Sequence, residues 1–151
     1  MIPKAIESID PTRLGPVDAI ISFAVLEHLL DPSAAFVGMA AALPPGGRMV
    51  HVVDYGPHGP WLAEPAPLDF LCPTPWLWDA MGSARGTPNR WRYPEVMAAL
   101  AAAGFDAIAD ITNRFTVAEI ARSRPRLARR FRDIPDEGLI PQEAVIVAVR
   151  R

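Results

Sequence analysis

Residues 17–54, VDAIISFAVLEHLLDPSAAFVGMAAALPPGGRMVHVVD, carry the pattern of a strand, a helix and a second strand. Val17 to Phe23 is a nearly continuous apolar run, which is typical of a parallel strand buried on both faces. Asp31 and Pro32 stand where a helix N-cap and the first helical residue belong. Apolar residues then recur at the spacing of one buried helical face until a PPGG segment ends the helix. Arg48 to Asp54 is predicted to be the second strand.

The order of these elements predicts how the two strands are arranged. A strand, a crossover helix and a second strand of this length form a right-handed parallel unit. The two strands are therefore expected to be neighbours that point the same way. Their carboxyl ends, at Phe23 to His28 and at Asp54 to His58, should open at one edge of the sheet, where ligands bind in doubly wound folds.

Composition indicates one ordinary globular domain. The chain has 151 residues, half of them hydrophobic, which suits a single domain over residues 1–151. A net charge of −2 gives no general attraction to nucleic acid or to an anionic membrane. The single cysteine, Cys72, cannot form an intrachain disulfide, so a cytoplasmic protein is expected. No apolar run is long enough for a membrane span, and the first ten residues lack the apolar core of a signal peptide.

The second half of the chain continues the alternation of loop, helix and strand. Residues 55–75 are crowded with Pro and Gly, and we expect the segment 55–93 to lie over the ligand-binding edge as a substrate-side lid. Pro94 opens a helix that Gly104 ends. Phe105 to Thr116 alternates between apolar and polar residues, which predicts a strand with one wet face. Ala144 to Val149 is a continuous apolar run and predicts a central strand.

A basic segment, RSRPRLARRFR, lies within the helical region from Val117 to Arg132. It could bind phosphate or nucleic acid. Because Pro125 interrupts it and the net charge is negative, a solvated surface is the favoured interpretation.

Several motifs resemble a known family. DAIISFAVLEHLLDP followed by LPPGGRMVHVVD is similar to the second half of a class I S-adenosylmethionine-dependent methyltransferase of the type 11 kind. VDYGPHG, DFLCPTPWLW and NRWRYPEVMAALAAAGF, in that order, resemble a subgroup associated with sugar, lipid or polysaccharide biosynthesis. The resemblance runs from Val17 to about Phe105. It implies an α/β fold with a partial Rossmann-like sheet, in which parallel strands and one antiparallel strand are flanked by helices. The strand at Ala144 would be the antiparallel one, between the strands at Arg48 and Phe105.

The resemblance also implies that part of the fold is missing. Family members hold the cofactor with a glycine-rich turn after the first strand and an acidic residue after the second, and neither motif precedes Val17. Roughly 60 residues would be needed for these units, at about 30 per βαβ unit. The expectation is a carboxyl-terminal half that lacks the first three strands. Its strand at Val17 would then be an apolar sheet edge, through which the chain is expected to form a homo-oligomer or to bind a partner.

The family pattern assigns candidate site residues to three groups. Methyl transfer is an in-line displacement that depends mainly on positioning, and histidine is the usual base where one is needed. The candidates are His58 and Asp54 for catalysis; Ser22, Phe23, Ala24 and His28 for S-adenosyl-L-methionine; and Asn89, Arg90, Arg92 and Trp78 for the substrate.

Structural interpretations of the same residues stay open. His51 lies among apolar neighbours in a strand and is favoured as a hydrogen-bonded structural histidine. For Asp54 the alternative is a residue that only caps a turn, and for Ser22 to Ala24 it is a buried strand end. Arg90 and Arg92 flank Trp91 and could form a stacked surface pair. The tryptophans are favoured as core or lid packing.

Two functions from different classes therefore remain. The first is methyl transfer from S-adenosyl-L-methionine to a small-molecule, sugar or lipid acceptor. The alternative is a non-catalytic remnant or interaction subunit that needs a partner for the cofactor site. No metal is expected, because a site made by His51, Asp54 and His58, with His28 nearby, would combine a strand and a Pro/Gly loop without a fixed facing geometry.

Overall fold

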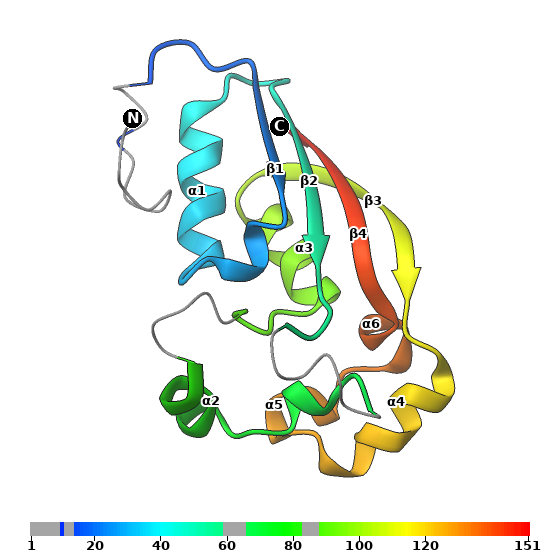
Figure 1. The fold of residues 1–151 in the computed structure, drawn as a ribbon. Coiled ribbons are helices and arrows are strands. Elements are labelled where there is room, and N and C mark those ends of the chain that lie inside the picture. The colour runs from blue at the N-terminus through cyan, green and yellow to red at the C-terminus, as the bar shows by residue number, and fades with distance from the viewer. Residues whose placement is uncertain (1–9, 11–13, 59–65, 83–87) are drawn as a thin grey trace.

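The centre of the molecule is a mixed sheet of four strands in the order β1-β2-β4-β3 (Figure 1). The structure, a computed structural model, describes residue 10 and residues 14–58, 66–82 and 88–151. β1 and β2 pair in parallel, and β4 pairs antiparallel with both β2 and β3. The strands are β1 (Ala19–Phe23), β2 (Arg48–Asp54), β3 (Phe105–Arg114) and β4 (Pro141–Arg150).

The strand pairing confirms two predictions. The strands that flank the first helix are parallel neighbours, in a register that runs from Ala19 beside Arg48 to Phe23 beside Val52. The strand predicted at Ala144 to Val149 is part of β4, and β4 lies between β2 and β3 as an antiparallel strand. The fold class is therefore the mixed α/β sheet, with parallel strands and one antiparallel strand, that the resemblance implied.

Helix α1 (Pro32–Ala42) begins and ends where the sequence predicted. The Asp31 side chain caps it, with Oδ1 accepting a hydrogen bond of 2.9 Å from the backbone N–H of Ala34. Phe36, Met39 and Leu43 are buried against the sheet. Beyond the helix, Gly46 has a φ of +80°, a conformation that costs glycine little and that turns the chain into β2.

The other helical elements are short. They are η3 (Leu26–His28), η5 (Asp69–Leu71), α2 (Pro75–Gly82), α3 (Tyr93–Ala102), α4 (Val117–Ser123), η6 (Arg124–Arg126), α5 (Arg129–Arg132) and α6 (Asp136–Leu139).

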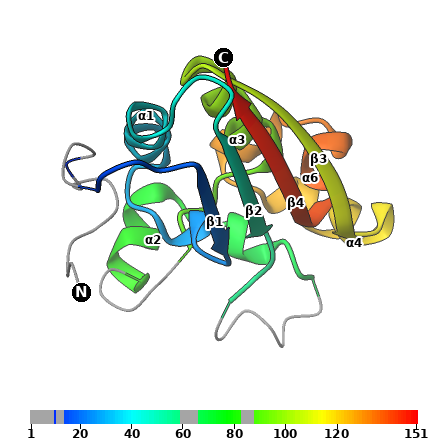
Figure 2. The ribbon, with the colours of Figure 1, turned by 90° about the horizontal axis from the view of Figure 1, so that it is seen from above.

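Helices α1 and α3 cover the same face of the sheet (Figure 2). Between them and the strands lies the main core, in which Met49, Ile146 and Ala148 from the sheet meet Phe36 of α1 and Leu100 of α3. All five of these residues are fully buried. This packing fixes α1 and therefore the two loops at its ends.

The opposite face of the sheet is open. Ile21 and Phe23 of β1 are 77% and 73% exposed, and Ile108 of β3 is 74% exposed. The register aligns Ile21, Val50, Val147 and Ile108 across all four strands. We call Ile21, Phe23, Val50, Val147 and Ile108 the open sheet face.

The open sheet face corrects the prediction that Val17 to Phe23 is buried on both sides. An apolar run shows only that a strand can be covered. Burial also needs a second layer, and no helix within the described part of the chain supplies one (Figure 2). Strand β3 behaves as predicted, since Asp106, Asp110 and Thr112 are exposed on alternate positions of an outer strand.

Helices α2, α4 and α5 lie beyond the carboxyl ends of β2 and β3 (Figure 1), and their apolar side chains belong to a second apolar cluster. It joins the segment predicted as a lid to the basic helical region. Its members are Leu68, Phe70, Leu71, Trp78, Phe115, Ile120, Leu127, Ala128, Phe131 and Leu139. Arginines of the basic segment pair with nearby acids, as Arg126 does with Asp69 and Arg130 with Glu95, which agrees with a solvated surface.

Parts of two predicted segments lie outside the described residues. These are residues 59–65 and 83–87 of the predicted lid, and most of the loop predicted at Met1 to Pro16. Among the described helices, none has the length and apolar character needed to cross a membrane.

Candidate functional site

The carboxyl ends of β1 and β2 lie next to each other, as the parallel unit predicted. Ser22 and Phe23 of β1 align with His51 and Val52 of β2, and the backbone N–H of Ala24 donates to the carbonyl of Val52 at 3.0 Å. This edge therefore brings the cofactor-side candidates of β1 beside the loop that follows β2.

Ser22 makes a structural contact within the sheet. Its Oγ lies 2.7 Å from Nδ1 of His51, which is fully buried. Burial lowers the pKa of His51 to about 4, so the ring is neutral at physiological pH. This hydrogen bond agrees with the structural interpretation of His51. It also means that the Ser22 hydroxyl is already engaged within the sheet.

Phe23 and Ala24 end β1 in different ways. The Phe23 ring is 73% exposed on the open sheet face. Ala24 has a φ of +50°, in the left-handed region that residues with a Cβ seldom adopt. The chain reverses sharply here and enters η3.

Asp54 and His58 form a hydrogen-bonded pair just after β2. The distance from His58 Nε2 to Asp54 Oδ2 is 3.1 Å, and the two side chains are 26% and 38% exposed. The backbone N–H of Gly56 donates to the other oxygen, Asp54 Oδ1, at 2.6 Å. Asp54 thus caps a turn and orients an imidazole at the same time, so the two interpretations of this residue are compatible.

His28 faces this pair from the neighbouring loop. The ring centroids of His28 and His58 are 5.1 Å apart, with the planes tilted by 43°. His28 lies at the exposed end of η3. The histidines predicted at the two strand ends therefore meet in space, whereas His51 does not join them.

Glu27 is a site residue that the sequence analysis missed. It is only 5% exposed, and neither carboxylate oxygen has a hydrogen-bond partner among the residues that the structure describes. Burial raises the pKa of Glu27, and the Asp54 carboxylate adds to this effect. The backbone amides of Glu27 and Asp54 and the His58 ring act in the opposite direction, although no amide reaches hydrogen-bond geometry.

A signal for Glu27 was present in the sequence. Apart from His28, the residues on both sides of Glu27 in the sequence AVLEHLL are apolar, which is unusual for an acid on a solvated surface. Its burial follows from packing of this turn against a segment more than sixty residues away, which periodicity does not reveal.

Asn89 holds that turn in place. Its Nδ2 donates to the carbonyls of Leu26 and Leu29 at 2.9 and 3.0 Å, and its backbone N–H donates to the carbonyl of Glu27 at 2.6 Å. The Asn89 side-chain oxygen accepts from the backbone N–H of Trp91 at 2.9 Å. Asn89 was predicted to bind substrate, but its polar groups are engaged in these contacts.

Arg90 and Arg92 are buried rather than presented to a ligand. Arg90 donates to the carbonyls of Phe70 and Pro73, and its guanidinium stacks 4.5 Å from the ring centre of Trp78. Arg92 is fully buried and donates to the carbonyls of Tyr55 and Pro141 at 2.6 and 3.0 Å. Burial lowers the pKa of Arg92 to about 10, so it stays charged at neutral pH.

These contacts change the interpretation of the substrate group. Arg90 stacks on Trp78 rather than on Trp91, and Trp78 is only 6% exposed. The Trp78 Nε1–H donates to the carbonyl of Pro88 at 3.1 Å. In this structure Arg90, Arg92 and Trp78 join the loops beyond the sheet to one another, and no surface fork for an anion is formed by these two arginines.

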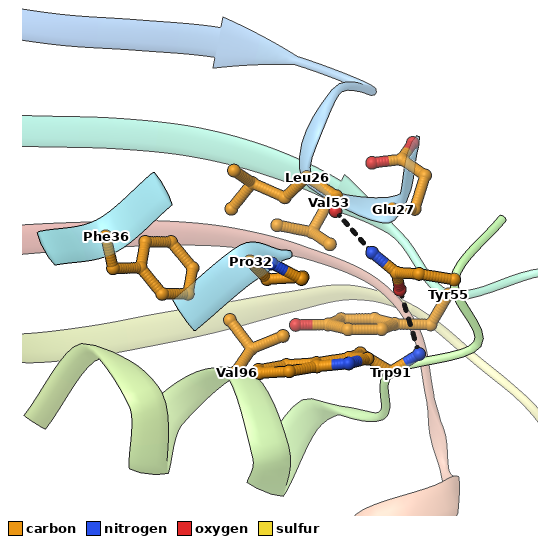
Figure 3. A pocket seen from close by; sticks show the side chains of 9 residues that line it. Leu26, Glu27, Pro32, Phe36, Val53, Tyr55, Trp91 and Val96 are labelled. Atoms are coloured by element: carbon orange, nitrogen blue, oxygen red, sulfur yellow. Dashed lines mark hydrogen bonds between the residues drawn. The ribbon is translucent and has the colours of Figure 1, made fainter. Parts of the chain in front are cut away.

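A small cavity lies between η3, the start of α1 and the start of α3 (Figure 3). It has room for about one water molecule. Burial raises the pKa of the Tyr55 hydroxyl in its wall, and within the described residues this hydroxyl has no hydrogen-bond partner. The lining residues are Leu26, Glu27, Pro32, Phe36, Val53, Tyr55, Asn89, Trp91 and Val96.

Solved structures share this arrangement of strands and helices. An S-adenosylmethionine-dependent methyltransferase from Mesorhizobium loti matches with a TM-score of 0.51 and 19% identity, over 88% of this chain and 61% of that one. The YcgJ protein from Bacillus subtilis matches with a TM-score of 0.51 and 16% identity, over 97% of this chain and 68% of that one. Geranyl diphosphate C-methyltransferase from Streptomyces coelicolor, in complex with Mg²⁺, geranyl diphosphate and S-adenosyl-L-homocysteine, matches with a TM-score of 0.50 and 19% identity, over 89% and 46% of the two chains.

The chain has the fold of S-adenosylmethionine-dependent methyltransferases. It spans 61% of the length of the Mesorhizobium loti enzyme, so it corresponds to part of that fold. No family model matches the sequence, and no curated protein matches it. The resemblance stated from the motifs is thereby confirmed at the level of the fold.

The candidates predicted to bind the cofactor lie at the carboxyl end of β1. The Phe23 ring and His28 are exposed there, and Ala24 is half-buried. The Ser22 hydroxyl is engaged with His51.

Proposed function

We propose that this chain carries the acceptor side of an S-adenosylmethionine-dependent methyltransferase. The proposed reaction transfers a methyl group to a small-molecule, sugar or lipid acceptor. The observation that supports it best is the His58–Asp54 pair, which lies at the carboxyl ends of two parallel strands in a methyltransferase fold. In doubly wound sheets this edge is where ligands bind.

The cofactor would lie against the end of β1. When bound, S-adenosyl-L-methionine supplies the methyl group from its sulfonium centre. Phe23 offers an exposed aromatic face, and Ala24, with its small side chain, lets a ligand approach the backbone. His28 would border the same pocket from η3.

His58 would act on the acceptor. Its Nε2–H donates to Asp54, which leaves Nδ1 as the nitrogen that can accept a proton from an acceptor hydroxyl or amine. Asp54 holds the ring in this orientation, and Gly56 in turn holds Asp54. In that transfer His58 would take the proton that the acceptor loses.

The segment 55–93 is proposed to cover this edge as a lid. In the described part of this segment, Leu68, Phe70 and Leu71 pack with α4 and α5 in the second apolar cluster. This anchoring would place the lid beyond the strand ends, where it could exclude water from the acceptor.

Calorimetric titration with S-adenosyl-L-methionine and S-adenosyl-L-homocysteine, followed by transfer of a labelled methyl group to sugar and lipid acceptors, tests the proposal. His58→Asn should leave cofactor binding unchanged and lower the rate of transfer about 10²–10⁴-fold, as expected for loss of a general base. Asp110→Asn, which changes an exposed carboxylate on β3, is the control and should leave both cofactor binding and transfer unchanged. Equal transfer rates for wild type and His58→Asn would overturn the catalytic role of His58.

A second candidate function is an interaction subunit without catalysis of its own. The open sheet face and the unpaired edge of β1 favour it, since both need a covering layer that the described residues do not provide. In this case the cofactor would bind only after a partner supplies the other wall. Absence of binding to the chain alone, with binding after addition of the partner, would distinguish this candidate from the first.

A further inference from the structure

Three potential metal ligands meet between the ends of β1 and β2. Glu27 and His28 come from η3, and His58 comes from the loop after β2. One ligand atom of each residue lies within 4.8 Å of the ligand atoms of the other two. The residues differ in burial, since Glu27 is buried, His58 is half-buried and His28 is exposed.

Glu27 gives the strongest reason to expect a cation here. The residue is only 5% exposed, and in the described part of the chain neither of its buried carboxylate oxygens is hydrogen-bonded. A buried carboxylate without partners is costly, whereas a bound cation would satisfy both oxygens and the charge.

His58 is oriented as metal-bound histidines usually are. Such histidines donate their second ring N–H to a carboxylate or carbonyl, which fixes the tautomer and aims the free nitrogen at the ion. His58 Nε2 lies 3.1 Å from Asp54 Oδ2, and Gly56 fixes the Asp54 carboxylate with a hydrogen bond of 2.6 Å. Nδ1 of His58 is then the nitrogen that can face an ion.

The backbone of the turn that carries Glu27 and His28 is already fixed before any ion binds. Asn89 bonds to the carbonyls of Leu26, Glu27 and Leu29, so the two ligands of η3 start from a fixed backbone. Ligand atoms around an ion at about 2.0–2.2 Å would lie roughly 3.3 Å apart. The ligand atoms lie within 4.8 Å of one another before an ion binds, so binding would draw the side chains closer together.

We propose that Glu27, His28 and His58 form a binding site for a divalent first-row transition metal ion. Two imidazole nitrogens and one carboxylate suit zinc, cobalt or iron better than Mg²⁺, which prefers oxygen ligands. Three protein ligands leave coordination positions open to water or to an acceptor oxygen. This site replaces the arrangement with His51 that the sequence analysis considered, because His51 bonds to Ser22 instead.

The metal site does not depend on the proposed methyl transfer, since it can be measured on the chain without cofactor or acceptor. With an ion bound, His58 is a ligand and cannot also take the acceptor proton. Transfer assays with and without the ion therefore separate the two roles of His58.

Metal-free protein should be titrated with Zn²⁺ and Co²⁺ by calorimetry, and the visible absorption of bound Co²⁺ should be recorded. We expect one ion per chain. Glu27→Gln, His28→Asn and His58→Asn should each weaken the affinity at least about 10-fold, and Asp54→Asn about 10–100-fold, as for other partners of metal-bound histidines. Asp110→Asn and Cys72→Ser are controls that should leave the affinity unchanged.

His28→Asn decides the outcome if a buried variant fails to fold, because His28 is exposed. Absence of saturable binding by wild type would overturn the proposal. The same affinity for His28→Asn, His58→Asn and wild type would also overturn it. Binding of Mg²⁺ with no binding of Zn²⁺ or Co²⁺ would contradict the assigned class of metal.

Discussion

His51 couples the stability of the fold to pH. Burial lowers its pKa to about 4 in the folded protein, against an ordinary value of 6.5. Between these values the unfolded chain binds a proton that the folded chain does not, so the free energy of unfolding falls as the pH drops from 6.5 towards 4. The loss should reach about 3 kcal/mol, and urea unfolding at several pH values measures it.

His51→Gln removes this titration, because glutamine has no proton to gain in this range. Its free energy of unfolding should depend less on pH between 6.5 and 4 than that of the wild type. Parallel pH dependences for the two proteins would show that another group causes the loss.

Arg92 ties the end of β2 to the start of β4. It donates to the carbonyls of Tyr55 and Pro141 from a fully buried position. Arg92→Met should lower the free energy of unfolding by roughly 3 kcal/mol, because two buried carbonyls lose their donor. Arg92→Lys should recover only part of this, since an ammonium group lacks the planar fork. A change below about 1 kcal/mol in chemical denaturation would contradict this role.

At the scale of elements, the start of α1 is stabilised by Asp31. Its carboxylate accepts a hydrogen bond from Ala34 N–H and lies near the positive end of the helix. Asp31→Ala should lower the free energy of unfolding by about 1 kcal/mol. Asp31→Asn retains the capping oxygen and should cost less. Thermal or urea unfolding of the three proteins measures these differences. An equal loss of unfolding free energy in both variants would contradict the prediction.

The elements themselves could be predicted from the sequence where local rules are strong. Asp31, Pro32 and the PPGG segment marked both ends of α1, and alternation marked the polar face of β3. Parallel pairing of β1 with β2 followed from chain connectivity. These signals brought the ends of the two strands, and with them His28, Asp54 and His58, to one edge.

Other features depended on contacts between distant segments. An apolar run does not state whether a second layer covers it, which is why β1 was predicted to be buried. Arg90 and Arg92 look like surface arginines in the sequence, but they donate hydrogen bonds to backbone carbonyls of three remote segments. The burial of Glu27 depends in the same way on Asn89.

At the scale of the molecule, the open sheet face predicts association of the isolated chain. Its five apolar side chains run across four strands and adjoin the edge of β1, with which no other described strand pairs. Exposed apolar surface of this kind favours contact with another polypeptide. The apparent mass of this chain in sedimentation velocity should therefore rise with concentration.

Phe23→Lys and Ile108→Lys should shift that concentration dependence towards the monomer. Both side chains are more than 70% exposed, so these changes should alter the free energy of unfolding little. Val37→Lys, on the exposed side of α1, is the control for added charge. A wild-type chain that sediments as a monomer at all concentrations would contradict the prediction.

Asn89 joins residues 26–29 to the segment that precedes α3 by hydrogen bonds, so the two sides of the cavity cannot move independently. A ligand that shifts residues 26–29 would therefore also shift the backbone at Asn89. Amide hydrogen exchange offers a direct readout: a ligand held by Glu27 or His28 should slow exchange at Asn89, and Asn89→Ala should abolish that remote response.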